Sequence, residues 1–145
     1  MSSLRSLLFV VTGGMLISGC LGGGPSEPPL GSVKGTVKIN GQPTASLEVV
    51  FEPQIASGQK AADVGAASRA ITDAGGAYEL IYKQTKGAVI GTHTIRINRA
   101  AAGGPAGGEG GAKLGAPIPE NYNAKSNITK EVKAGENTID IDITL

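Results

Sequence analysis

Alternating apolar and polar positions recur in short stretches from Val33 onward. The clearest stretch is VKGTVKI (33–39), in which the aliphatic side chains share one side and the lysines share the other. Because successive side chains of a β-strand point to opposite faces, this pattern predicts a half-buried strand. The dipeptide Asn40-Gly41 follows, and it favours a tight turn because both residues tolerate positive φ angles.

Six further stretches predict strands by the same reasoning. LEVVFEP (47–53) and AYELIY (77–82) alternate clearly, whereas ASRAIT (67–72) is weaker because Arg69 and Ile71 share a side. The remaining predicted strands are residues 91–99, 128–134 and 137–145. Turn residues separate these stretches, as expected for strands that follow one another closely.

Seven short strands between residues 33 and 145, with no credible helix, predict an all-β fold. The expected architecture is a seven-stranded antiparallel β-sandwich of the Ig-like kind. A domain of this size can bury both inner faces without disulfides. The chain contains 23 glycines but only two Phe, three Tyr and no Trp, which suits a fold with many turns.

A segment rich in Gly, Ala and Pro, residues 100–117, interrupts the strands. Its glycines do not resemble a phosphate-binding loop, because neither a Gly-Lys-Ser/Thr ending nor a helix follows them. The simplest interpretation is a disordered insertion between two strands. A mobile interaction loop is the functional alternative.

The first 19 residues are typical of an export signal. Arg5 provides a positive start, and LLFVVTGGMLI (7–17) is an apolar stretch of signal-peptide length. This stretch is too short to cross a bilayer comfortably, which takes about 20 residues, and Thr12 weakens it further. We therefore expect residues 1–19 to be a signal peptide rather than a transmembrane anchor.

The signal region leads into Ile17-Ser18-Gly19-Cys20, which contains the single cysteine of the chain. This sequence resembles the bacterial lipobox, in which an aliphatic residue and two small residues precede a cysteine. The resemblance implies cleavage between Gly19 and Cys20 and a thioether from the Cys20 sulfur to diacylglycerol. It also implies acylation of the new amino group, for example with palmitate. An ordinary secretory signal that happens to contain a cysteine is the alternative.

Residues 20–32 are expected to be a lipidated cysteine followed by a flexible linker. LGGGPSEPPLGS (21–32) is rich in Gly, Pro and Ser, and it is stiffer at Pro28-Pro29. As a flexible coil these residues span roughly 20 Å. Bacterial sorting signals retain a lipoprotein at the inner membrane through an Asp after the cysteine. By resemblance to that rule, Leu21 favours the outer membrane over the inner membrane.

The charge balance excludes some partners. The chain has 13 Lys and Arg residues against 12 Asp and Glu, and Arg5 lies in the expected signal peptide. The remaining chain is therefore balanced, and it has no basic stripe interleaved with aromatic residues. We expect no nucleic-acid binding and no general electrostatic attraction to acidic lipid.

Several segments together resemble a known domain family. They are VKGTVKINGQP (33–43), VVFEP (49–53), TDAGGAYEL (72–80), KGAVIGTHTIRI (86–97) and IPENYNAKSNITKEVKAGENTIDIDI (118–143). These segments are similar to bacterial carboxypeptidase regulatory-like domains, most of all the small lipoprotein forms. The resemblance covers residues 33–145 and implies a transthyretin-like sandwich that acts as a binding or structural module.

The resemblance does not extend to an enzyme. The transthyretin-like fold also hosts a urate-pathway hydrolase, but that family has more histidines and a Tyr-Arg-Gly-Ser ending, whereas this chain ends IDITL. The carboxypeptidase connection concerns an accessory sandwich, and the zinc-binding His-x-x-Glu motif does not occur here. We expect no catalytic residues, no metal and no cofactor.

His93 is the only histidine of the chain. It shares a side with Ile95 and Ile97, so a histidine packed in the core or at a sheet edge is the simplest interpretation. A catalytic base is the alternative. Cys20 cannot serve as its nucleophilic partner if the sulfur is a thioether.

Two further residues have structural explanations at the sequence level. Asp73 begins the turn DAGG (73–76), which is expected to close a hairpin, with a calcium ligand as the alternative. Tyr122 precedes the penultimate predicted strand and resembles a tyrosine corner, in which a phenol ties a connecting loop to nearby backbone. A ligand contact is the alternative for Tyr122.

Pairs of carboxylates complete the candidates. Asp140 and Asp142 share a face and are expected to be solvated carboxylates that discourage edge pairing, rather than calcium ligands. Glu48 and Glu52 point outward from another strand, where a catalytic pair would depend on the fold. The sequon at residues 127–129 has no expected role in a bacterial lipoprotein.

These patterns predict a lipid-anchored cell-envelope protein, held at the membrane through Cys20. Its sandwich is expected to act as a structural or protein-interaction module, with an envelope protein or glycan as the possible partner. The alternative is an extracytoplasmic binding module for a small ligand or an envelope glycan, which would use loops at one end of the sandwich. No ligand-binding residue is assigned.

Overall fold

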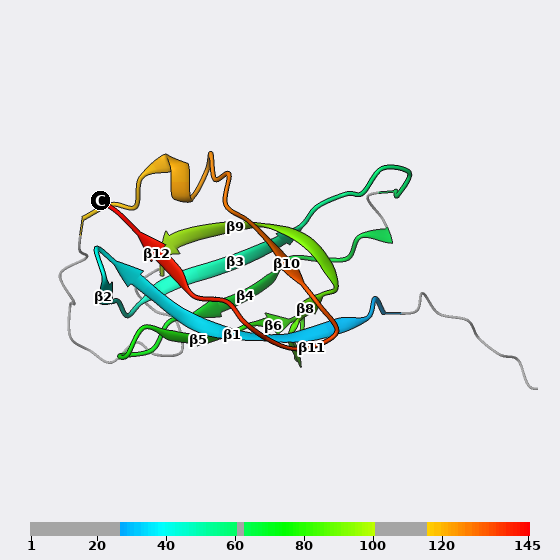
Figure 1. The fold of residues 1–145 in the computed structure, drawn as a ribbon, viewed down its shortest axis with the longest axis horizontal. Helices are drawn as coiled ribbons and strands as arrows, with labels where there is room; N and C mark the ends of the chain where they lie inside the picture. Colours follow the sequence, from blue (N-terminus) through cyan, green and yellow to red (C-terminus); the bar gives the residue numbers. More distant parts are fainter. Residues whose placement is uncertain (1–26, 61–62, 101–115) are drawn as a thin grey trace, which may run out of the picture.

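The structure is a computed structural model that describes residues 27–60, 63–100 and 116–145 (Figure 1). In these ranges the chain forms β-strands and a short 3₁₀ turn at Glu120–Tyr122. The strands lie in two sheets that face one another. The expected all-β sandwich is therefore confirmed.

Sheet one is organised around its long first strand, β1 (Leu30–Ile39). Two short strands from the end of the chain pair with one edge of β1 in parallel, β11 (Gly135–Thr138) and β12 (Ile141–Ile143). Three short strands pair antiparallel with the same residues of β1 and so occupy its other edge: β8 (Ala88–Val89), β5 (Ala77–Glu79) and β2 (Gln42–Pro43). The first predicted strand is thus the centre of a sheet.

Sheet two is antiparallel throughout and has the order β10-β9-β3-β4-β6-β7. Its strands are β10 (Thr129–Val132), β9 (Gly91–Arg99), β3 (Leu47–Pro53), β4 (Ser68–Ile71), β6 (Ile81–Tyr82) and β7 (Thr85–Lys86). The longest pairing joins β3 to β9, from Leu47 opposite Arg99 to Pro53 opposite His93. Sheet two therefore has a continuous four-strand body with a small hairpin at one edge.

The predicted strand at residues 77–82 divides between the two sheets. Its first half, β5, pairs with β1, whereas its second half, β6, pairs with β4. Leu80 lies at the crossing, where it is fully buried and its N–H donates to the carbonyl of Val33 at 2.9 Å. The chain crosses again between β8 and β9, at Ile90. These crossings explain why seven predicted strands become a larger number of short segments.

The last predicted strand is also interrupted, at Ile139 and Asp140 between β11 and β12. At this interruption the carbonyl of Ile139 packs closely against Gly35. A Cβ added to Gly35 would lie only 1.9 Å from the Ile139 oxygen. Asp140 fills the gap in the ladder, since its Oδ1 accepts the N–H of Thr36 at 2.8 Å. Asp140 is exposed, as expected of a solvated carboxylate, and it has in addition this backbone partner, which the sequence did not indicate.

The core between the sheets contains the inward positions that alternation predicted. Fully buried members from both sheets include Val33, Val37, Leu47, Val49, Phe51, Ile95, Ile97 and Ile143. Phe51 has aromatic neighbours, with its ring centroid 6.4 Å from that of Tyr78 and 5.8 Å from that of His93. The side-chain period of two therefore predicted most of the core, but the prediction that Leu145 faces the core with Ile143 is wrong, since Leu145 is 44% exposed at the end of the chain.

Strand β1 begins three residues earlier than expected, at Leu30. Gly31 and Ser32 pair with the first residues of β11, and the carbonyl of Pro29 accepts the N–H of Ile90 at 3.0 Å. Residues 29–32, predicted as part of the linker 20–32, thus belong to the folded domain. Residues 20–26 of that linker lie outside the described residues.

Candidate functional site

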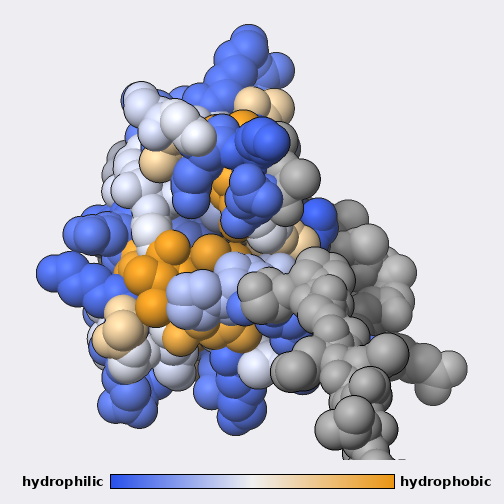
Figure 2. All heavy atoms as spheres, turned by 90° about the vertical axis from the view of Figure 1, so that its right-hand side faces the viewer, coloured by the Kyte–Doolittle hydropathy of each residue, from blue (hydrophilic) through white to orange (hydrophobic). Residues whose placement is uncertain are grey.

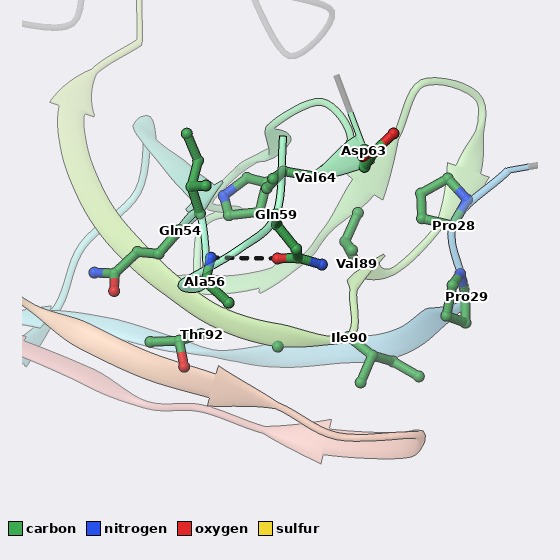
Figure 3. Close-up of a pocket in the computed structure, with 13 residues that line it drawn as sticks. Pro28, Pro29, Gln54, Ala56, Gln59, Asp63, Val64, Val89, Ile90 and Thr92 are labelled. Carbon is green, nitrogen blue, oxygen red and sulfur yellow. Dashed lines mark hydrogen bonds between the residues drawn. The ribbon is translucent and has the colours of Figure 1, made fainter. Parts of the chain in front are cut away.

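One end of the sandwich carries a cleft with a volume of about 430 Å³. It lies where β1 begins, at the right of Figure 1, and Figure 2 faces this end. Four segments line it: residues 28–29, 53–56 with Gln59, 63–64, and 89–92. Their side chains converge on one hollow although they are far apart in sequence (Figure 3).

The β3–β4 loop forms one wall of the cleft. The loop bends back at Gly58, whose φ of 89° suits glycine. Gln59 closes the bend in two ways: its side-chain Oε1 accepts the N–H of Ala56 at 3.2 Å (Figure 3), and its backbone N–H donates to the Ala56 carbonyl at 3.0 Å. The N–H of Gln54 donates to the Thr92 carbonyl at 2.8 Å, which ties the loop base to β9.

The lining of the cleft is mostly apolar. Ile55 and Ile90 are 57% and 36% exposed at its rim, and Val64 and Val89 lie deeper. Figure 2 shows apolar atoms gathered in the middle of this face, with hydrophilic residues around them. Exposed apolar groups that cluster in this way mark contact surfaces more often than isolated ones do.

Two of the polar side chains that line the cleft have hydrogen-bond partners within the protein. The Gln54 side chain donates to the Thr94 hydroxyl at 2.9 Å, and Gln59 holds the loop as described. Asp63 is the charged residue among the described residues of the lining, none of which is aromatic. The described lining therefore offers apolar contact and lacks the stacking rings that a sugar site uses.

His93 lies behind the cleft, in the core, and does not line it. Its Nδ1 is 3.0 Å from the carbonyl of Gly91, and no described residue is a hydrogen-bond partner of its buried Nε2. Burial lowers the pKa of the imidazole, and the Gly91 carbonyl opposes this shift in part. His93 is therefore a packed core histidine, as its position in the pattern predicted.

The turn at Asp73 matches its expected structural role. The Oδ1 atom of Asp73 accepts the N–H groups of Gly75 and Ala77 at 2.8 and 2.9 Å. Gly76 has a φ of 73° and donates its N–H to the Asp73 carbonyl at 2.9 Å. The buried Thr72 hydroxyl joins the hairpin to the start of β3, since it accepts the N–H of Leu47 at 3.0 Å.

Two tyrosine hydroxyls connect loops to distant backbone. Tyr122 accepts the N–H of Thr144 at 3.3 Å, which agrees with the loop-anchoring role expected for it. Tyr78 donates to the carbonyl of Ile139 at 2.6 Å, a contact that the sequence did not indicate. Burial raises the pKa of the Tyr78 phenol well above its usual range, and the carboxylate of Asp140 raises it further.

The outward carboxylates of β3 are paired with arginines across the outer face of sheet two. Glu48 lies 2.9 Å from Arg69, and Glu52 lies 2.7 Å from Arg96. Arg96 also donates to the backbone carbonyls of residues 123 and 124, both at 2.8 Å. Glu48 and Glu52 therefore form ion pairs that link neighbouring strands on the outer face of sheet two.

The last two candidates have simple surroundings. Asp142 accepts the N–H of Gly41 at 3.3 Å and so supports the turn after β1. Asn127 of the sequon is exposed just before β10. Gly19, Cys20, the signal peptide 1–19 and most of the segment 100–117 lie outside the described residues.

Within residues 27–60, 63–100 and 116–145, no group of three or more His, Cys, Asp or Glu side chains is placed to hold a metal ion. In the same part of the chain no helix is long and apolar enough to span a bilayer. The chain matches no model of a protein family, and no curated protein or solved structure is significantly similar to it. The functional argument therefore depends on the residues of this chain.

Proposed function

We propose that this protein is a lipid-anchored component of a bacterial cell envelope, attached through Cys20 and without enzymatic activity. Its β-sandwich serves as a structural or protein-interaction module outside the cytoplasm. The observation that carries the proposal is the motif Ile17-Ser18-Gly19-Cys20, which ends eight residues before Pro28. Pro28 lines the cleft of the folded domain, so little chain separates the motif from the sandwich.

The anchoring step has a clear physical basis. Each buried CH₂ of an acyl chain contributes about 0.8 kcal/mol, and one myristoyl chain gives only marginal binding. A diacylglyceryl thioether with an acylated amino group carries two or three chains on Cys20, which holds a protein at a membrane permanently on this scale. Leu21 after the cysteine favours the outer membrane.

The surroundings of the polar candidates support a non-catalytic module. Glu48 and Glu52 are paired with arginines, Asp73 and Asp140 accept backbone N–H groups, and His93 is buried. A catalytic acid or base needs access to the atom that it protonates or deprotonates. In the described part of the chain these groups are engaged in holding the fold.

Anchoring is tested by expressing the full chain in a bacterial host and measuring the mass of the mature protein. We expect the mass of a chain that starts at Cys20 with acyl groups attached, and its recovery in the outer-membrane fraction. Globomycin, which inhibits the lipoprotein signal peptidase, should leave the precursor uncleaved. Cys20→Ser should also remain unprocessed, whereas the control Ser18→Ala keeps a small residue and should mature normally. A mature chain without lipid, or normal maturation of Cys20→Ser, would overturn the proposal.

The alternative function, binding of a small ligand or envelope glycan, would use the cleft described above. A ligand that binds only the folded state stabilises the protein by RT ln(1 + [L]/Kd) and so raises the melting temperature of the protein. A thermal-shift screen and a glycan array therefore separate the two functions. The absence of aromatic rings among the described lining residues favours the structural or interaction module over a glycan site.

A further inference from the structure

The cleft is at the end of the sandwich where the chain from Cys20 enters the domain. Pro28 and Pro29 line the cleft, and the carbonyl of Pro29 accepts the N–H of Ile90 at 3.0 Å. The entering chain is thereby fixed beside the exposed side chain of Ile90. Whatever Cys20 is attached to must therefore be close to this face.

The eight residues from Cys20 to Pro28 limit the distance to the anchor. As a flexible coil they span about 16 Å, and fully extended they reach about 28 Å. Strand β1 runs from this end to the opposite end, where Asn40 follows it and accepts the N–H of Leu145 at 3.0 Å. Ten strand residues extend over about 33 Å. Leu145 is therefore separated from the cleft by the length of the sandwich (Figure 1).

The chemistry of the cleft face suits a lipid surface. Ile55 and Ile90 stand exposed at its rim beside two prolines. At the same end the carboxylate of Glu27 is 3.3 Å from the ammonium of Lys83, so these two charges offset one another, and Asp63 is the charged side chain of the described lining itself. Apolar side chains that project from a polar rim insert at the boundary between headgroups and acyl chains.

We propose that the cleft end of the sandwich rests on the bilayer, with Ile55 and Ile90 inserted between the headgroups. The inference depends on the proposed lipid anchor at Cys20. Two isoleucines would hold a free domain at a membrane only weakly. A short tether, however, turns the contact into an intramolecular step at an effective concentration in the millimolar range. The anchored domain then lies in one orientation, with the Leu145 end directed away from the membrane.

The absence of tryptophan from the chain allows a direct test with single-Trp variants. Ile55→Trp and Ile90→Trp place the reporter at the cleft, and Leu145→Trp is the matched control, since Leu145 is 44% exposed at the opposite end. The full-length lipoprotein is reconstituted into phosphatidylethanolamine–phosphatidylglycerol vesicles whose acyl chains carry bromine near the headgroups. We expect the two cleft reporters to lose about half of their emission and the control to lose little, because bromine quenches by contact at that depth.

Each other outcome has a defined meaning. Acylated protein in which the cleft reporters are quenched no more than Leu145→Trp would overturn the docking and leave the anchor standing. Emission that depends on the surface density of protein but not on bromine would show that a second copy covers the cleft, which also overturns it. A protein mass without acyl groups would overturn the anchor and the docking together. Circular dichroism checks folding, and either cleft variant suffices if the other fails to fold.

Discussion

The hydroxyl of Tyr78 donates a hydrogen bond of 2.6 Å to the carbonyl of Ile139. That carbonyl lies against Gly35 of β1, at the point where the C-terminal strand is interrupted between β11 and β12. Ile139 also donates its own N–H to the carbonyl of Lys34 at 2.8 Å. The hydrogen bond of Tyr78 therefore stabilises the break between β11 and β12. Because of this break, the last segment of the chain can follow β1 along its whole length.

Tyr78→Phe should weaken the fold, because it leaves the Ile139 carbonyl without its side-chain donor. Loss of a partly buried hydrogen bond of this kind costs about 1–2 kcal/mol. Urea unfolding followed by circular dichroism measures the difference. Tyr82→Phe is the control, since the Tyr82 hydroxyl accepts a long hydrogen bond of 3.4 Å from Ala66. Equal losses in the two variants would contradict the role assigned to Tyr78.

Gly35→Ala should be far more damaging. An added Cβ would lie 1.9 Å from the Ile139 oxygen, which is backbone and cannot rotate away. Overpacking that forces two strands apart is expected to cost about 3 kcal/mol or more. Gly75→Ala is the matched control, because its Cβ would meet only the Asp73 carboxylate at 3.4 Å. A Gly35→Ala protein with an unchanged melting temperature would show that the strands do not approach so closely.

His93 should make the protein less stable in mild acid. Burial lowers the pKa of the folded imidazole below its ordinary value of 6.5. As the pH falls below about 6.5, the unfolded chain binds a proton that the folded chain does not, so the free energy of unfolding decreases. Unfolding free energies of the wild type and of His93→Gln, compared between pH 8 and pH 5, measure this contribution. The wild type should lose more stability than the variant, and parallel pH profiles would rule out the assignment.

Asp73 should act as a turn residue in solution. Asp73→Ala removes the acceptor of two backbone N–H groups and should cost about 1–2 kcal/mol in thermal unfolding. Asp73→Asn keeps an oxygen at the same position and should cost less. Calcium added to the wild type should leave the melting temperature unchanged. A rise in melting temperature with calcium that is lost in Asp73→Ala would instead support a metal site.

The core of this protein was predictable from local sequence alone. Val33, Val37 and Ile39 alternate with lysines, and all three are buried as predicted. Even in the weak stretch at 67–72 the alternation indicated which side faces solvent, since Arg69 and Ile71 share a side and both are exposed. Side-chain alternation is a local property of extended backbone, so it is visible without knowledge of strand partners.

The candidate site was less predictable. The loops at one end of the sandwich were named as a possible binding region, but the prolines at 28–29 were assigned to the linker. The hydrogen bond between Pro29 and Ile90 joins residues about sixty positions apart. Tyr78 belongs to the alternating stretch 77–82 and is buried, yet its hydroxyl partner 61 residues away was not predictable. Contacts between distant residues depend on strand pairing, which no local pattern encodes.

By itself the sequence determined the longer strand-forming stretches, most of their inward positions, the turn at Asp73 and the lipobox-like motif at Cys20. The tertiary structure decided that the last strand runs parallel to β1, and that the stretch at 77–82 belongs half to each sheet. It also decided that the start of the domain and two distant loops form one apolar cleft. The physical reason is that backbone alternation is set by neighbours in the chain. Pairing, register and clefts are set by which buried surfaces fit together in space.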